Sequence, residues 1–345
     1  MKSLVQGMMA VAALALLPLA YAGQPLTDGK GAPLVHLNVA AAGWNGSTLP
    51  GVEGRDYAFP DATYLDKWQK AGIRVIRFGI VWERLQPTLN GDFAPVYAQR
   101  LDTFFAQAAA HNMGVIFDVH NFGRWNGNSV IGTSAAPTSA FQDLSRRVAQ
   151  RWGNNPGLHG YDLMNEPYGD ADTYWKANAQ AGINGVRAFD KVHPIYVEGR
   201  AFSNTTSYPT LNADLLTLTD PSNNLVYSGH MYLDPGSSGQ YNKPITGTFD
   251  PMIGVNRAKP FVEWLALNHK RGQIGEFGVP DDDPRWLTGM DNLLAYLHDH
   301  CVPLAYWAAG PLWGKDRVAI EPINGVARPQ WPVLSKWLVK TNTCP

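Results

Sequence analysis

The chain has 345 residues, and its hydrophobic content of 45% is typical of a globular protein and excludes a disordered chain. Its 28 basic and 29 acidic residues nearly balance, so no strong field favours nucleic acid or an anionic membrane, and a neutral partner is the simpler expectation. Two cysteines are too few for a disulfide scaffold.

The first 22 residues are predicted to be a secretory signal peptide. Lys2 precedes an apolar run over residues 8–19, and the small-residue triplet Ala20-Tyr21-Ala22 follows. The run is too short for a membrane-spanning helix. We therefore expect cleavage near Ala22, a secreted protein that is periplasmic or extracellular, and one folded domain over residues 23–345. No linker, repeat or heptad run indicates a second domain, and we expect a monomer.

Eight short β-rich runs alternate with amphipathic segments along the chain. In order, the runs cover residues 34–40, 73–80, 114–120, 160–164, 194–198, 225–232, 273–277 and 303–307. Helical periodicity is evident over residues 97–111, 140–152, 171–190 and 284–300. Asp61 and Ser139 are expected to be helix N-caps.

Eight strands that alternate with helices predict an α/β protein whose parallel sheet closes into a (β/α)₈ barrel, the TIM-barrel fold. An open doubly wound sheet is the alternative fold. It is disfavoured because no Gly-rich phosphate loop follows an early strand.

Three loop segments rich in Gly, Ser and Asn, residues 43–54, 121–134 and 234–242, each follow a predicted strand. They should therefore lie at the carboxyl ends of the strands, where barrel enzymes build their active sites. Twelve Trp residues exceed what the core needs. Those beside loop signals are expected to line a binding surface, and those within strand or helix patterns to pack: Trp44, Trp125 and Trp313 in the first group, Trp82, Trp264 and Trp337 in the second.

Cys301 and Cys344 lack the clustered Cys and His spacing of a zinc site. In an oxidising compartment they can form one disulfide, which would stabilise the fold by about 4 kcal/mol on the chain-entropy model. Two buried free thiols are the alternative.

Two glutamates occupy strand ends that should meet. Asn165-Glu166-Pro167 follows the fourth run, and Gly275-Glu276-Phe277-Gly278 ends the seventh, so both carboxylates reach the same rim of the barrel. Two carboxyl groups about 5 Å apart cannot both ionise freely, which lets one act as an acid while the other attacks as a carboxylate. Either glutamate alone would be weak evidence, because most Glu residues are solvated surface groups.

The remaining strand ends supply a matching polar set, namely Arg77, His120 with Asn121, His230 with Tyr232, and Trp307. His230 and Tyr232 share one face of their strand, as do Asp118 and His120, so each pair can point inward together. Each residue alone could be structural, since Asp118 could merely hold His120 and Arg77 could be an ion-pair partner. Together with the two glutamates, these residues occupy six strand ends, and that agreement favours a functional site.

At these residues the sequence resembles family 5 of the glycoside hydrolases over nearly the whole mature chain, and the endoglucanases (cellulases) of that family in particular. The motifs that carry the resemblance are Leu49-Pro50-Gly51, Trp82-Glu83-Arg84-Leu85-Gln86-Pro87, Asp118-Val119-His120-Asn121, His230-Met231-Tyr232-Leu233-Asp234, Gly275-Glu276-Phe277-Gly278 and Trp307-Ala308-Ala309-Gly310-Pro311.

The resemblance implies that Glu166 protonates the leaving oxygen and that Glu276 forms the glycosyl-enzyme. It implies that Arg77 and Tyr232 flank Glu276 and keep it ionised, and that His230 lies near Glu166. Asn165 and His120 would bind hydroxyls of the reacting sugar, and Trp307 would stack beneath its ring. No cofactor or metal is implied, and the partner would be a β-glucan polysaccharide or oligosaccharide.

Two segments depart from the family's pattern. Gly43-Trp44-Asn45 stands after the first strand, where the cellulases often carry Glu-Phe-Gly, and Phe202 follows the fifth strand, where Trp is common. Both places should contact sugars beyond the cleavage point, so the departures leave the substrate open.

The leading expectation is a secreted endo-β-1,4-glucanase that acts with retention. The alternatives are a β-mannanase or mixed-linkage glucanase with the same chemistry, a non-catalytic sugar-binding barrel, and a metallohydrolase barrel. The non-catalytic barrel is disfavoured because both glutamates are present, and the metallohydrolase because His120 and His230 alone do not supply a ligand set.

Overall fold

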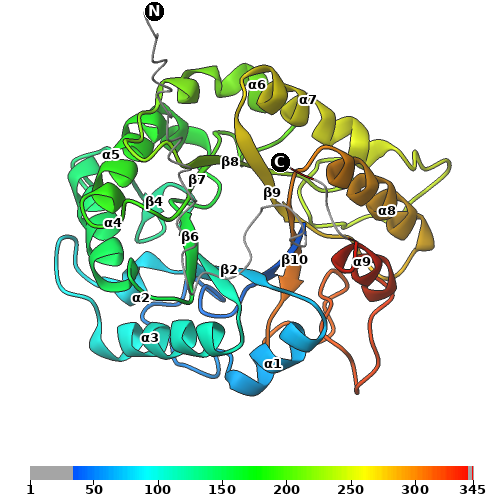
Figure 1. Ribbon diagram of the computed structural model, residues 1–345, viewed down its shortest axis with the longest axis horizontal. Coiled ribbons are helices and arrows are strands. Elements are labelled where there is room, and N and C mark those ends of the chain that lie inside the picture. The colour runs from blue at the N-terminus through cyan, green and yellow to red at the C-terminus, as the bar shows by residue number, and fades with distance from the viewer. Residues whose placement is uncertain (1–33, 341–343, 345) are drawn as a thin grey trace, which may run out of the picture.

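Eight parallel strands form a closed barrel in the order β1-β10-β9-β8-β7-β6-β3-β2 (Figure 1). The computed structural model describes residues 34–340 and Cys344. The barrel strands are β1 (Val35–Val39), β2 (Val75–Ile80), β3 (Gly114–Val119), β6 (Leu158–Asp162), β7 (Ile195–Glu198), β8 (Leu225–His230), β9 (Arg271–Phe277) and β10 (Leu304–Ala309). The predicted (β/α)₈ fold is confirmed, and the open doubly wound sheet is wrong.

Helices surround the barrel on its outside (Figure 1). The longer ones are α1 (Ala62–Lys70), α3 (Pro95–Ala110), α4 (Thr138–Trp152), α5 (Trp175–Arg187), α7 (Ile253–Leu267), α8 (Pro284–Asp299) and α9 (Trp331–Leu338). The short ones are α2 (Trp82–Leu85), α6 (Tyr208–Leu211) and the 3₁₀ turns η1 (Gly169–Thr173) and η2 (Ala213–Thr217). The helix expected over residues 171–190 is thus divided into η1 and α5.

One of the two predicted N-caps is confirmed. The Asp61 carboxylate accepts the backbone N–H of Tyr64 at 2.9 Å and caps α1. Ser139 as a cap is wrong, because α4 begins at Thr138 with Pro137 as its N-cap, so Ser139 lies inside the helix. Proline has no N–H to satisfy, and its fixed φ suits the residue that leads into a helix, so the helix starts directly after it.

The fourth barrel strand lies two residues earlier than the sequence predicts. β6 ends at Asp162, whereas the expected run covered residues 160–164. Leu163 and Met164 are buried although they follow the strand, so hydrophobicity continues past the end of its pairing. As a result Asn165 and Glu166 lie in the loop beyond the strand rather than at its last position.

The barrel carries an apolar outer layer and a polar interior. Trp82, Trp264 and Trp337 are buried in the hydrophobic core, as predicted. Buried polar and charged side chains come instead from the barrel strands: Asn38, Arg77, Asp118, Asp162, Glu198, Ser228, Gln273 and Glu276. This polar interior lies beneath the rim that both glutamates reach.

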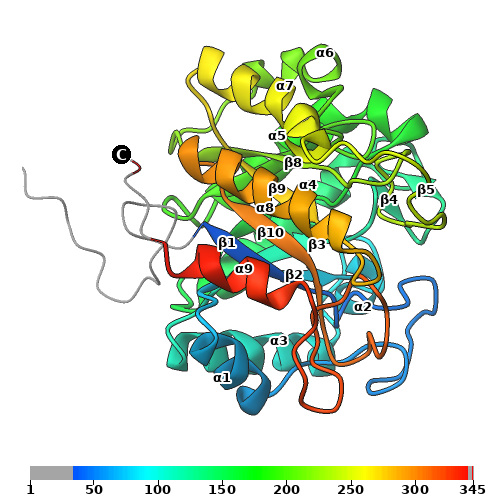
Figure 2. The same ribbon diagram turned by 90° about the vertical axis from the view of Figure 1, so that its right-hand side faces the viewer.

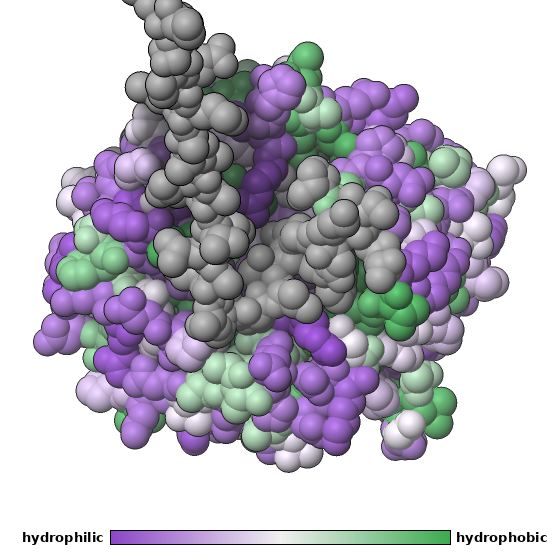
Figure 3. Space-filling model, viewed as in Figure 1, coloured by the Kyte–Doolittle hydropathy of each residue, from purple (hydrophilic) through white to green (hydrophobic). Residues whose placement is uncertain are grey.

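The two ends of the barrel differ. A small antiparallel hairpin, β4 (Arg124–Trp125) with β5 (Ser129–Val130), follows β3 and lies at the carboxyl ends of the strands (Figure 2). A disulfide joins Cys301, which precedes β10 at the opposite end, to Cys344, with 5.6 Å between their Cα atoms. Over the described part of the face in Figure 3, hydrophilic and hydrophobic residues are interspersed.

Among residues 34–340 and Cys344, no helix is long and apolar enough to cross a membrane. The predicted signal peptide lies outside the described residues.

Candidate active site

Glu166 and Glu276 face one another at the carboxyl end of the barrel. Carboxylate oxygens of the two residues and a ring nitrogen of His230 all lie within 4.8 Å of one another. Carboxyl groups about 5 Å apart allow one of them to attack the substrate directly, whereas a water molecule between them would need about 6.5–9.5 Å. The spacing therefore favours a covalent double displacement.

Glu276 lies in β9 and is held by two donors. Arg77 Nη1 donates to Glu276 Oε1 at 2.9 Å, and the Tyr232 hydroxyl donates to Oε2 at 2.9 Å. Burial and then the charge of Glu276 raise the pKa of Tyr232 well above its ordinary value, so its hydroxyl remains a donor. A cation and a hydroxyl donor stabilise the negative charge that a nucleophilic carboxylate requires.

Glu166 follows β6 in a left-handed backbone conformation, with φ of 44°. Its backbone N–H donates to Glu198 Oε2 at 2.6 Å, and its Oε1 lies 2.8 Å from Nδ1 of His230. Burial alone would lower the pKa of His230, but the carboxylates of Glu198 and Glu276 and the hydrogen bonds of the ring raise it well above its ordinary value. The cationic form of His230 is therefore favoured beside Glu166.

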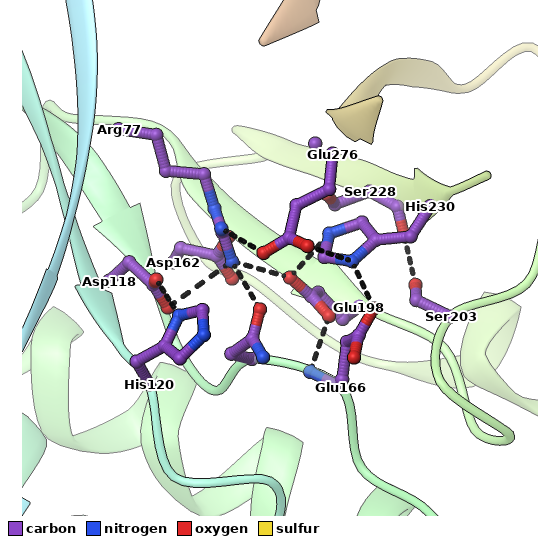
Figure 4. Close-up of polar contacts among 12 residues, drawn as sticks. Arg77, Asp118, His120, Asp162, Glu166, Glu198, Ser203, Ser228, His230 and Glu276 are labelled. Carbon is purple, nitrogen blue, oxygen red and sulfur yellow. Dashed lines mark hydrogen bonds and ion pairs between the residues drawn. The ribbon is translucent and has the colours of Figure 1, made fainter. Parts of the chain in front are cut away.

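Arg77 is the centre of the polar interior (Figure 4). Besides Glu276, its guanidinium contacts Asp118 at 3.3 Å, Asp162 at 2.8 Å and Glu198 at 2.8 Å. Burial, with the nearby charges of Glu198 and Asp118, raises the pKa of Asp162 well above its ordinary value, although the attraction of Arg77 opposes this. The neutral form of Asp162 is therefore favoured.

Asp162 and Glu198 were not predicted from the sequence to belong to the site. A signal was available, because each is a charged residue that ends a buried strand, at the rim where the selected residues lie. Only the barrel's closure shows that both converge on Arg77.

Aromatic rings line a hollow of about 160 Å³ beside the two glutamates, together with Asn38, Arg77 and His120. The rings are those of Trp44, Trp307 and Trp313. Trp313 packs edge-on against the other two, with ring centroids 4.9 Å from Trp44 and 5.7 Å from Trp307. Aromatic faces in a concave site suit the apolar faces of sugar rings.

His120 joins this hollow to the polar interior. Its Nδ1 lies 2.8 Å from Asp118 Oδ2, and its ring lies nearly parallel to Trp307, with centroids 5.6 Å apart. Burial opposes its charge, but Asp118 raises the pKa of His120 above the ordinary value. The Asp118 carboxylate thereby fixes the orientation of the His120 ring beside Trp307.

The structure distinguishes the two predicted asparagines. Asn165 accepts from Arg77 Nη2 at 2.9 Å, and its buried Nδ2 has no protein partner among the described residues, so it can donate to a ligand. Asn121 instead donates to Glu83 at 2.8 Å and accepts from the backbone N–H of Trp82 at 2.8 Å. Asn121 thus fastens the loop after β3 to α2.

Trp125 is the predicted aromatic that does not reach the hollow. It lies in β4, is half-buried, and packs against the hydrophobic core. The adjacent Asn126 backbone N–H donates to Glu83, which fixes the hairpin to α2.

A second aromatic surface lies on the other side of Glu166. Phe202, from the loop after β7, is 49% exposed and stacks on Tyr168, with ring centroids 4.3 Å apart and planes at 13°. Arg124 lies over the opposite surface, 4.1 Å from the Tyr168 centroid. The Phe202 backbone N–H donates to Pro167, so this pair is coupled to the segment that carries Glu166.

Glu166, His230 and Glu276 are the one set of described His, Cys, Asp and Glu residues close enough to hold a metal ion. Their chemistry does not fit a cation. Arg77 and Tyr232 already donate to both oxygens of Glu276, and His230 carries a positive charge of its own.

Comparisons with known proteins agree with this geometry. Residues 29–312 match the family model described as cellulase (glycosyl hydrolase family 5). Endo-β-1,4-glucanase B of Aspergillus niger is 33% identical over 286 residues, which cover 82% of this chain and 83% of that protein.

Solved structures of bacterial proteins are similar throughout. The endoglucanase Cel5A of Pseudomonas stutzeri, in complex with cellobiose, is 39% identical with a TM-score of 0.88, over 94% of this chain and 99% of that chain. XacCel5A, in complex with cellopentaose, is 30% identical with a TM-score of 0.82, over 89% of this chain and 99% of that chain.

Proposed function

Because the chain belongs to the cellulase family, family 5 of the glycosyl hydrolases, and is therefore a glycoside hydrolase, we propose that it is a secreted endo-β-1,4-glucanase that acts with retention. The observation that carries the mechanism is the pair of carboxylates within 4.8 Å, one of them held between Arg77 and Tyr232. The substrate class is supported by the similar proteins, which are named as endo-β-1,4-glucanases or were solved with cello-oligosaccharides.

In the first step, Glu276 attacks the anomeric carbon while Glu166 protonates the departing glycosidic oxygen. The C–O bond to the leaving sugar breaks, and a glycosyl ester forms on Glu276. In the second step, Glu166 removes a proton from water, which attacks the ester and releases Glu276. Two inversions give net retention, and the proton that Glu166 donates is recovered.

The supporting residues have roles that follow from their positions. Arg77 and Tyr232 keep Glu276 charged, and the free Nδ2 of Asn165 donates to a sugar hydroxyl. His120 and Trp307, which lie side by side in the hollow, contact the reacting sugar, which flattens toward an oxocarbenium ion in the transition state. Trp44 and Trp313 extend the binding surface along the chain.

One assay tests the substrate and the mode of cutting together. The purified protein is incubated with carboxymethyl cellulose, barley mixed-linkage glucan, glucomannan and xylan, and product lengths are followed over time. An endo-β-1,4-glucanase rapidly lowers the viscosity of the first substrate and yields a range of cello-oligosaccharides. Preference for glucomannan or mixed-linkage glucan would instead select the corresponding alternative, and release of a single short product would contradict endo cutting.

Substitution of each glutamate tests the mechanism. Glu276→Ala should abolish glycosylation on every substrate. Glu166→Ala should lose about 10²–10⁴-fold on polysaccharide but retain its first step on dinitrophenyl cellobioside, whose leaving group needs no proton. Near wild-type activity of Glu276→Ala would contradict the assignment, and NMR of fresh product should show the β-anomer first.

The remaining expectations concern the mature protein. We expect cleavage after Ala22, which amino-terminal sequencing of protein recovered from the culture medium or periplasm would test. We also expect a monomer, for which the test is the molar mass in light scattering.

A further inference from the structure

We propose that Glu198 is a positioning residue of the reaction, which fixes the backbone of Glu166 and holds His230 as a cation between the two glutamates. The inference rests on the proposed function only for the roles of acid/base and nucleophile.

Glu198 lies below the site and does not reach the substrate. It ends β7, is fully buried, and is absent from the lining of the hollow. One oxygen, Oε2, accepts the Glu166 backbone N–H at 2.6 Å. The other, Oε1, accepts from Arg77 Nη2 at 2.8 Å and lies 2.9 Å from His230 Nε2 (Figure 4).

Every group that faces Glu198 is a donor. Arg77 and the backbone N–H of Glu166 have no acceptor to offer, and a cationic His230 places a second positive charge beside Oε1. Both oxygens must therefore accept, which only the ionised carboxylate does. Glutamine has the same shape, but it would direct an NH₂ group at a donor wherever its amide is oriented.

Glu166 needs such an anchor because its backbone is strained. A residue with a side chain rarely adopts a φ of 44°, and such a conformation persists only where surrounding contacts hold it. The hydrogen bond to Glu198 is a direct contact of that kind, and it fixes the direction in which the Glu166 side chain leaves the loop.

His230 is held between carboxylates on two sides. Its Nε2 lies 2.9 Å from Glu198 Oε1 in an ion pair that lacks hydrogen-bond alignment, and its Nδ1 lies 2.8 Å from Glu166 and 3.7 Å from Glu276. The other charged or titratable groups near this cluster are Arg77, its ion-pair partners Asp118 and Asp162, and Tyr232, which donates to Glu276. When Glu166 releases its proton to the leaving oxygen, the Nδ1–H of His230 can donate to the new carboxylate. The negative charge of Glu198 stabilises the cationic ring that carries this proton.

The test compares Glu198→Gln with Asp162→Asn. Both variants replace a buried carboxylate that contacts Arg77, but Asp162 contacts neither His230 nor the Glu166 backbone in the described contacts, and burial favours its neutral form. Glu198→Gln should lower kcat by about 10²-fold, because the acid is displaced, and should leave KM nearly unchanged, because Glu198 does not contact substrate. Asp162→Asn should retain the His230 titration of the wild type.

The decisive measurement is NMR of ¹⁵N-labelled histidine rings over a pH series. In the wild type, His230 should remain protonated above the ordinary histidine range, and in Glu198→Gln its titration should move to lower pH. An unchanged His230 titration and kcat in folded Glu198→Gln would overturn the proposal.

Should Glu198→Gln fail to fold, the wild-type spectrum decides, since a neutral His230 at pH 7 would also overturn it. The NMR readout does not depend on hydrolysis. Absence of glucanase activity in the wild type would therefore refute the proposed function while the role of Glu198 is still measured.

Discussion

Asp162 lies against the same guanidinium as Glu276, yet its surroundings favour the neutral acid. Arg77 is divided among four carboxylates, and Oδ1 of Asp162 is buried without a hydrogen-bond partner among the described residues. An unpaired oxygen in a buried site penalises the charged form. A buried cation therefore does not guarantee that each of its neighbours is ionised.

Because the pKa of Asp162 is raised in the folded protein, we predict that the free energy of unfolding depends on pH. In the unfolded chain Asp162 loses its proton near pH 3.9, whereas the folded protein retains it because burial raises the pKa. As the pH rises above about 3.9, folding must take up a proton at Asp162, and its contribution to stability falls by about 1.4 kcal/mol for each pKa unit of the shift. Below pH 3.9 both states are protonated, and that contribution is fully present.

Asp162→Asn carries no such proton and should therefore gain stability relative to the wild type between pH 4 and pH 7. Urea denaturation at both values measures the difference. An equal difference at pH 4 and pH 7 would contradict a neutral Asp162.

The rings of Trp307 and Trp44 should act at different stages of the reaction. Trp307 lies next to His120 in the hollow, and in the proposed reaction it stacks against the reacting sugar, so its contact should improve as the sugar flattens. Trp307→Ala should lower kcat by about tenfold or more, which corresponds to about 1.4 kcal/mol of transition-state stabilisation. Trp44 lies farther along the hollow, so Trp44→Ala should chiefly raise KM on long substrates.

Circular dichroism and thermal melts of both variants separate loss of binding from loss of fold. A folded Trp307→Ala with wild-type kcat would remove Trp307 from the site, and an unchanged KM in Trp44→Ala would leave that ring without a substrate role.

At the scale of elements, the sequence predicted the type and order of the strands and helices better than the residues at which they begin and end. Hydrophobicity identifies the fourth strand, but it continues through Leu163 and Met164 after pairing has ended at Asp162. Asp61 could be recognised as a cap because its carboxylate satisfies a free N–H, whereas Pro137 precedes α4 without any side-chain hydrogen bond. Strand and helix ends depend on backbone partners that composition does not reveal.

We predict a second surface that binds substrate at Phe202, in the loop after β7, and Tyr168. Phe202→Ala should raise KM on long cello-oligosaccharides severalfold, because it removes an exposed aromatic face beside the segment that carries Glu166. Its effect on stability should stay within about 0.5 kcal/mol, as for other exposed positions.

Phe189→Ala is a matched control for Phe202→Ala. Phe189 is also 49% exposed, but it precedes β7 and so lies at the opposite end of the barrel. An equal rise in KM in both variants, or none in Phe202→Ala, would exclude the loop after β7 from substrate binding.

At the scale of the whole molecule, the sequence predicted the barrel and the two facing glutamates because both depend on chain order. Eight alternating strands leave few ways to close a parallel sheet, and the carboxyl ends of the fourth and seventh strands then share a rim. The sharing of Arg77 among four carboxylates was not predictable in this way, because it depends on the strand register and on side-chain direction inside the barrel. Asn121 and Trp125 show the same limit, since their positions suit the site but their contacts are made with Glu83, Trp82 and the core.

The disulfide closes a chain segment of 43 residues that includes β10 and α9, at the end of the barrel opposite the active site. Its chief effect should be on the unfolded chain, whose freedom it restricts by about 4 kcal/mol on the chain-entropy model. Cys301→Ser with Cys344→Ser should therefore lower the free energy of unfolding by about that amount and the melting temperature by several degrees, while kcat and KM stay unchanged. Urea denaturation of the double variant and of the wild type, each with and without reductant, measures this. Reductant should bring the wild type to the stability of the variant and leave the variant unaffected. Loss of activity in the folded variant would show that the bridge also shapes the distant site, contrary to this expectation.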